Sequence, residues 1–215
     1  MTRVPDPSKA AGRHVTVRIA LAALFGASTG LVSPASAQTI SSSYTSTAPK
    51  DCRVTGAGNG VDDSTTRFCP GKAGLGVLVS EDDLRETVSL GRSRAAASRE
   101  PAAHLWFGPF NSTTTTVEWR ALAGKPFAII QRWHLDDNND EDKNGRPTAK
   151  PMLAVTRLPP GPVCHVAYID VQANPNANEL ARKAADELAR GFKCGHDEVK
   201  VIGASGRAVE LATRR

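Results

Sequence analysis

The residues best suited to chemistry lie in an acidic segment near the middle of the chain. Asp140, Asp142 and Asn144 are followed by Gly145, which reproduces the first six positions, D-x-D-x-N-G, of a calcium-binding loop. Alternate oxygen ligands turn toward the ion in such a loop, and the glycine permits the bend. The twelfth position is Pro151 rather than a bidentate glutamate. The segment predicts a weak calcium site, with a solvated acidic loop as the alternative.

The nucleophiles and bases form no recognised catalytic motif. Residues 38–215 contain no GxSxG elbow, no HExxH pair and no glycine-rich phosphate loop. His134 and Asp136 are close in sequence, but a structural histidine explains that spacing equally well. Cys164 and His165 would point to opposite faces of a strand, so a disulfide is favoured over a zinc site. We assign no catalytic residue and no cofactor beyond the calcium hypothesis.

Aromatic side chains offer a second kind of site. Trp119 and Trp133 fit one face of a β-hairpin and are expected in the core. Trp106, Phe107 and Phe110 lie outside such a pattern and are predicted to form a surface for a sugar or peptide ligand.

Residues 1–37 have the organisation of a secretory signal peptide. Basic residues come first, an apolar run over 19–32 follows, and Ala35-Ser36-Ala37 precedes Gln38. The apolar run is short and broken by glycine, which disfavours a membrane anchor. We therefore expect a periplasmic or secreted protein.

Removal of the signal changes the charge balance. It takes 4 of 27 basic and 1 of 22 acidic residues, which leaves 23 against 21, or about +2. No basic stripe marks a nucleic-acid surface, and no second apolar run is long enough to cross a membrane. The expected partner is a ligand or an envelope protein.

The four cysteines of an exported chain predict two disulfides. Three pairings are open to four cysteines. Pairing Cys52 with Cys69 and Cys164 with Cys194 is favoured, because each bond then closes a local unit.

A strand and a helix join the last two cysteines. Residues 163–171 alternate as a strand, and residues 179–192 carry an apolar stripe at helical spacing. The helix is expected to cover the strand face that bears Cys164, Val166 and Tyr168.

Residues 113–135 predict a hairpin. A three-residue loop, Ala123 to Lys125, would place Trp119 on one face with Phe127, Ile129 and Trp133, whereas a two-residue loop would mix the faces. The opposite face would then hold a diagonal ion pair between Glu118 and Arg132.

Further strands are expected over 75–80 and 86–92, with a helical turn at 80–83 between them, and over 152–158. The fold class is α+β: an antiparallel β-meander with one principal C-terminal helix on one face and two disulfides. The expected organisation is a signal peptide over 1–37, a flexible polar leader over 38–50, a single domain over 51–203 and a tail over 204–215.

Three stretches, CPGKAGLGVLVSEDDLRETVSLGR, FGPFNS and VEWRALAGKPFAIIQRW, resemble a group of small exported proteobacterial proteins that are uncharacterised. The resemblance implies a bacterial envelope setting and brings no activity, cofactor or site residue.

These observations predict an exported, non-enzymatic domain that binds a ligand or a protein partner. One alternative is a hydrolase or other envelope enzyme of an unrecognised type. Another is a structural envelope accessory protein with a weak calcium-binding loop.

Overall fold

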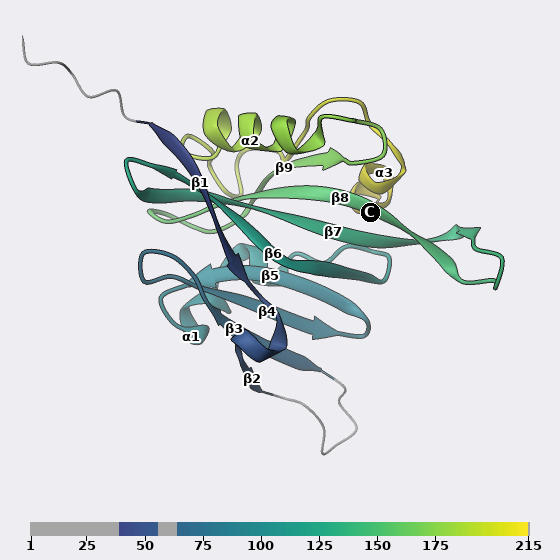
Figure 1. The fold of residues 1–215 in the computed structure, drawn as a ribbon, viewed down its shortest axis with the longest axis horizontal. Coiled ribbons are helices and arrows are strands. Elements are labelled where there is room, and N and C mark those ends of the chain that lie inside the picture. The colour runs from purple at the N-terminus through teal and green to yellow at the C-terminus, as the bar shows by residue number, and fades with distance from the viewer. Residues whose placement is uncertain (1–38, 56–63, 215) are drawn as a thin grey trace, which may run out of the picture. The chain divides into compact units, whose positions relative to one another are not determined.

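A computed structural model describes residues 39–55 and 64–214 (Figure 1). The chain divides into the units Met1–Ser36 and Ala37–Arg215, and all described residues belong to the second unit. The predicted signal peptide over 1–37 lies outside the described residues. No helix within the described ranges is both long enough and apolar enough to span a membrane.

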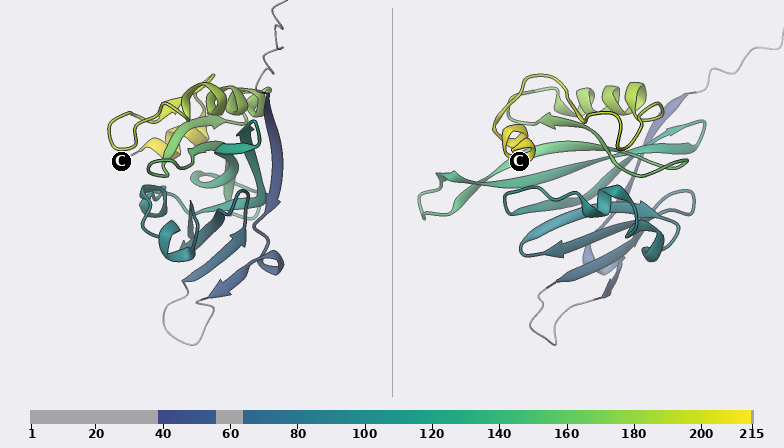
Figure 2. Two further views of the ribbon diagram at one scale, coloured as in Figure 1. Left: turned by 90° about the vertical axis from the view of Figure 1, so that its left-hand side faces the viewer. Right: turned by 180° about the vertical axis from the view of Figure 1, so that it is seen from behind.

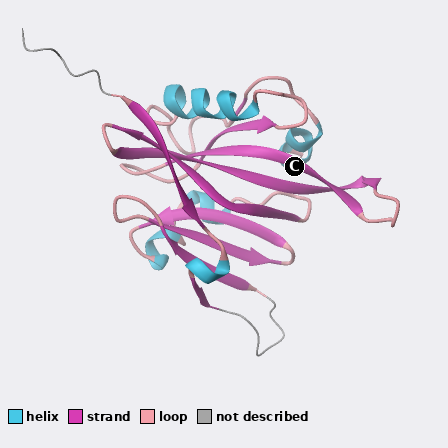
Figure 3. Cartoon of the chain, in the orientation of Figure 1, coloured by secondary structure: helices cyan, strands magenta, loops and turns pink. Residues whose placement is uncertain are grey.

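The larger sheet has six strands in the order β1-β6-β7-β8-β9-β10 (Figures 1 and 3). All neighbouring strands are antiparallel except β9 and β10, which are parallel. The four strands β6 to β9 follow one another in both chain and sheet, as the predicted meander requires. The strands are β1 (Ile40–Ser46), β6 (Asn111–Leu122), β7 (Lys125–Glu141), β8 (Pro147–Arg157), β9 (His165–Asp170) and β10 (Lys200–Val201).

A smaller four-stranded sheet, β2-β3-β4-β5, is antiparallel throughout and was not predicted as a separate sheet. The expected helical turn at 80–83 is wrong. Asp83 and Leu84 both have positive φ, 49° and 57°, and form the two-residue hairpin turn that matches the twist of paired strands. The strands are β2 (Arg53–Thr55), β3 (Thr65–Pro70), β4 (Gly76–Asp82) and β5 (Arg85–Gly91).

The two faces of the larger sheet are covered by different elements (Figure 2). On one face, Trp119 and Trp133 pack with Val77 and Val88 of the smaller sheet in a buried cluster. On the other face, the principal helix α2 (Ala177–Leu188) buries a row of alanines against the sheet. The predicted helix is present and covers one face, but it ends at Leu188 and does not reach residue 192. The short helices are η1 (Pro49–Asp51), α1 (Arg94–Ala97) and η2 (Pro101–His104).

The β6–β7 hairpin reaches the predicted register by a different turn. Ala123 and Gly124 form a two-residue turn with positive φ, and a bulge leaves Phe127 without a partner in β6. The predicted three-residue loop is therefore wrong, but Trp119 lies opposite Ile129 and on the predicted face. The bulge also moves Phe127 to the helix-covered face, so its predicted place beside Trp119 is wrong.

A second bulge, in β9, changes which sheet face some of its side chains occupy. His165 pairs with Thr156 and Ala167 with Val155, which leaves Val166 as the extra residue. Cys164 and Val166 face the helix as expected, but Tyr168 faces the smaller sheet. The alternation of apolar residues does not reveal this shift.

Both chain ends of the described unit are ordered elements. Much of the expected flexible leader over 38–50 is strand β1, which pairs with β6 over seven residues. The expected tail over 204–215 contains helix α3 (Arg207–Thr213), whose Ala208, Val209 and Leu211 are buried. The domain boundaries at 51 and 203 are therefore wrong.

Both predicted disulfides are present, Cys52 to Cys69 and Cys164 to Cys194. The first links the residue before β2 to β3, and the second ties the residue before β9 to the segment after α2. Each bond closes a short stretch of chain, 17 and 30 residues in sequence separation.

Candidate functional site

The three predicted calcium ligands lie at the far end of the β7–β8 hairpin, where the carboxylates of Asp140 and Asp142 have protein partners. The Asp140 carboxylate accepts hydrogen bonds from the Lys150 ammonium and, at 2.7 Å, from the Thr148 hydroxyl. Asp142 accepts from the backbone N–H groups of Asn144 and Arg146 at 2.8 and 3.0 Å. The Lys150 bond holds the pKa of Asp140 below its ordinary value. Calcium binding here stays a prediction.

The predicted aromatic surface divides into two parts. Trp106 and Phe110 are 44% and 37% exposed, and Arg85 lies over the Phe110 ring at 4.8 Å. Phe107 is 1% exposed and packs edge-on against Trp133, so its assignment to a ligand surface is wrong.

His134 and Asp136 lie two residues apart on strand β7. No hydrogen bond or ion pair joins His134 to Asp136 in the described part of the chain. Burial, together with Arg132, lowers the pKa of His134, and Asp136 opposes this only in part. His165 is enclosed by aromatic rings, burial lowers its pKa to about 4, and its Nδ1 lies 2.9 Å from the Tyr168 hydroxyl. A neutral, packed histidine of this kind is structural.

The predicted Glu118–Arg132 pair is not formed. The Glu118 carboxylate instead accepts a hydrogen bond from Arg182 of α2, whose Nε lies 2.7 Å away. Arg120 of the same strand donates two bonds to Asp186 of α2, at 2.9 and 2.6 Å. The helix brings these opposite charges to the sheet face, where sequence reasoning placed only strand residues.

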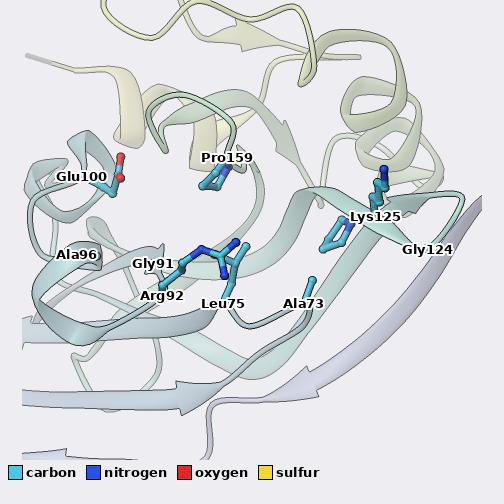
Figure 4. A pocket seen from close by; sticks show the side chains of 10 residues that line it. Ala73, Leu75, Gly91, Arg92, Ala96, Glu100, Gly124, Lys125 and Pro159 are labelled. Atoms are coloured by element: carbon cyan, nitrogen blue, oxygen red, sulfur yellow. The ribbon is translucent and has the colours of Figure 1, made fainter.

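The strongest candidate site is a groove formed by two adjoining hollows of about 430 and 570 Å³. Volumes of this size suit a small organic ligand. The hollows share Lys125, Pro126 and Pro159, so one surface runs from the β6–β7 turn to the loop after β8 (Figure 4). We call this surface the cationic groove.

The walls of the cationic groove are mostly apolar. One hollow lies beside the loop before β4 and the start of α1; Figure 4 shows Leu75 and Arg92 in it, with Pro159 and Lys125 at its sides. The other is lined by seven apolar residues: Leu122, Ala123, Pro126, Phe127, Leu158, Pro159 and Pro160. Prolines and bulged strands hold these walls in place, because neither has the freedom of a flexible loop.

Four cations line the cationic groove: Arg92, Lys125, Arg157 and Arg190. Within the described ranges, none of the four has a carboxylate at ion-pair distance. Arg190 lies over the Phe127 ring at 5.4 Å.

The hydrogen bonds of Arg157 and Glu100 determine how much charge the groove presents to a ligand. Arg157 donates to the carbonyls of Phe192 and Pro160, at 3.0 and 2.6 Å, while its buried Nε has no hydrogen-bond partner. Glu100, the one acid among the lining residues, accepts a bond from the Val163 N–H at 2.8 Å. The groove therefore presents an excess of positive charge beside apolar walls.

Sequence reasoning missed the cationic groove because its residues come from five separate segments between Ala73 and Arg190. No spacing rule links a turn lysine to an arginine that follows a helix. The LPPGP motif was a usable signal, since a rigid proline turn beside a strand end often forms a wall.

Comparison of the chain with protein-family models, with curated proteins and with solved structures gives no match.

Proposed function

We propose that the protein is an exported, non-enzymatic binding domain whose ligand is a small amphipathic anion held in the cationic groove. The single observation that carries this proposal is a set of four cations around an apolar, proline-lined hollow, none of which has a carboxylate partner among the described residues. Surface cations normally have solvent or a carboxylate beside them. Cations gathered around an apolar wall are suited to a ligand that has both an anionic head and an apolar body.

The compartment follows from the cysteines. Two disulfides are typical of a chain that folds in an oxidising compartment. Together with the predicted signal peptide, they support a periplasmic or secreted location. The resemblance to small exported proteobacterial proteins supports a bacterial envelope setting for the proposed ligand.

The two ends of the ligand would contact different kinds of surface in the groove. Phe127, Leu158 and the prolines would cover the apolar body and remove it from water. Lys125 and Arg190 are exposed and able to reach an anionic head. The buried Arg157 Nε, which lacks a partner, would gain from a nearby anion.

The test uses decanoate as the anion, with decyltrimethylammonium as a cationic probe of the same chain length. Isothermal titration of the mature chain, residues 38–215, is expected to show decanoate binding that weakens as salt increases, since screening reduces the attraction between exposed charges. The cationic probe is expected not to bind.

A pair of charge-removing variants locates the site. Lys125→Gln with Arg190→Gln is expected to weaken decanoate binding by about tenfold, because two charge contacts together contribute roughly 1.4 kcal/mol. Lys183→Gln with Lys143→Gln removes the same charge outside the groove and is expected to leave binding unchanged. Equal effects of the two pairs would contradict the proposal.

A further inference from the structure

Strand β1 forms one edge of the larger sheet. It pairs with β6 from Ile40↔Leu122 to Ser46↔Thr116 without a register shift. Among the described strands, none pairs with its outer side. The opposite edge of the same sheet, β10, is only two residues long.

The backbone groups that β1 directs outward can be identified from two hydrogen bonds. The Ala123 N–H donates to the Thr39 carbonyl at 3.2 Å, and the Thr47 N–H donates to the Thr115 carbonyl at 2.7 Å. Antiparallel bonds join directly opposed residues, and alternate residues of a strand turn their backbone groups to the same side. Odd-numbered residues of β1 therefore bond to β6. Ile40, Ser42, Tyr44 and Ser46 direct their N–H and C=O groups away from the sheet.

This edge lacks the usual protection against pairing with another strand. Natural edge strands carry charged residues, prolines or bulges, or they are very short. The sequence of β1, ISSSYTS, contains no charge and no proline, and its seven residues pair without a bulge. Pro49 follows only after the strand has ended.

We propose that β1 pairs antiparallel with β1 of a second copy of this chain, about a two-fold axis at Ser43. In that register Ile40 lies opposite the partner's Ser46, and Ser42 lies opposite the partner's Tyr44. All four outward-facing residues then form hydrogen-bonded pairs, so the edge is its own complement. The two larger sheets become one continuous sheet.

The side chains beside the edge fit this arrangement. Tyr44, 53% exposed, and Ser42 lie on the face that carries α2. Pairing places the partner's Tyr44 next to Ser42 and covers part of that ring. Two ion pairs, Glu118 with Arg182 and Arg120 with Asp186, neutralise most of the charge nearest this face, and Arg132 remains beside Tyr44 as one cation. An identical surface therefore meets little like charge, which favours a second copy over a charged foreign strand.

Cysteine cross-linking tests the register. The two Ser43 residues would face each other as a non-hydrogen-bonded pair, with Cα atoms about 4.5 Å apart, which suits a disulfide. The Ser43→Cys variant of the mature chain is expected to form a covalent dimer under air oxidation. Ser41→Cys would lie opposite the partner's Thr45 and is expected to stay monomeric on a non-reducing gel. Dimers of Ser41→Cys in equal yield would overturn the proposed register.

The oligomeric state tests the interface without new cysteines. Sedimentation of the unmodified mature chain at micromolar concentration is expected to show a dimer. Tyr44→Pro removes an outward N–H that makes no bond to β6, and is expected to give a folded monomer with a native far-UV spectrum. Tyr44→Phe keeps that N–H and is expected to stay dimeric.

Three results would overturn the proposal. They are a monomeric unmodified chain, a dimer that survives Tyr44→Pro, and cross-linking of Ser43→Cys in the periplasm to a different protein. The last result would assign the edge to a foreign strand. None of these outcomes depends on the cationic groove.

Discussion

The ion pair between Asp137 and Arg207 fixes the C-terminal helix to the larger sheet. Arg207 donates from Nε to Oδ2 at 2.6 Å and from Nη2 to Oδ1 at 2.7 Å. Asp137 is 3% exposed, so water replaces neither bond easily. The helix they hold contributes Ala208, Val209 and Leu211 to the core. We therefore predict that Asp137→Asn lowers the stability of the whole domain.

The size of this effect follows from the geometry. A hydrogen bond to a charged group contributes about 1.5–3 kcal/mol, and the amide of Asp137→Asn can still accept one bond from Arg207. The expected loss at pH 7 is about 2 kcal/mol, which lowers the thermal midpoint of a domain of this size by roughly 4–8 °C. Glu210→Gln is the matched control, because Glu210 contacts the same arginine at 3.3 Å from an exposed position. We expect it to change stability by less than about 0.5 kcal/mol.

The pH dependence gives an independent check. Hydrogen bonds from Arg207 lower the pKa of Asp137 to about 2 from 3.8. A carboxyl group with a lowered pKa adds stability above its unfolded pKa, and that stability is lost as pH falls through the folded pKa. The difference in thermal midpoint between the wild type and Asp137→Asn should therefore be full at pH 6 and shrink between about pH 4 and pH 2. A difference that does not change with pH, or none at pH 7, would refute the reasoning.

Three other predictions test further parts of the structure. Glu118→Gln should lower the free energy of unfolding by about 1–2 kcal/mol, because it weakens the bond from Arg182. Arg132→Gln should change the free energy of unfolding by less than about 0.5 kcal/mol, and equal effects of the two variants in chemical denaturation would contradict the observed pairing. Asn174→Ala removes two donated hydrogen bonds and one accepted hydrogen bond, to the Asp170 and Ala204 backbones. It should lower the free energy of unfolding by about 2 kcal/mol in chemical denaturation, and an effect under about 0.5 kcal/mol would count against this role. For the acidic loop, the solvated-loop alternative predicts that millimolar calcium leaves the thermal midpoint unchanged, because Asp140 is already bonded to Lys150 and Thr148. A calcium-dependent shift that disappears in Asp140→Ala would establish the calcium site instead.

Local patterns in the sequence were sufficient for several elements. The helix over 177–188 and the strands of the meander follow from periodicity, because each buries one face against a neighbour. Both disulfides follow from the preference for short closed loops. The place of Trp119 opposite Ile129 follows from the need to keep the apolar residues of two strands on one face.

Other features depend on contacts that no local pattern encodes. Strand β1 is polar and rich in serine, which resembles a linker, and only pairing with β6 makes it a strand. Helix α3 is seven residues long and depends on Asp170, which accepts from the Ala208 N–H at 2.9 Å. The bulges at Phe127 and Val166 shift side chains between faces without any change in the alternation of apolar residues.

The candidate site was harder to predict than the fold. Phe107 was grouped with Trp106 and Phe110 because all three lie outside the strand pattern. In the structure Trp106 and Phe110 are exposed, whereas Phe107 fills the core beside Trp133. The cationic groove joins the β6–β7 turn, the proline loop after β8, the segment after α2, and the loops before β4 and α1. Such a site exists only once the tertiary structure has formed.

Binding of decanoate to the mature chain, followed by isothermal titration in wild type and in Lys125→Gln with Arg190→Gln, tests the central claim most directly. The proposed function predicts saturable binding with one site per chain, about tenfold weaker in the double variant and unchanged in Lys183→Gln with Lys143→Gln. Binding of decyltrimethylammonium as tight as that of decanoate, or decanoate binding that the groove variant leaves unaltered, would contradict it.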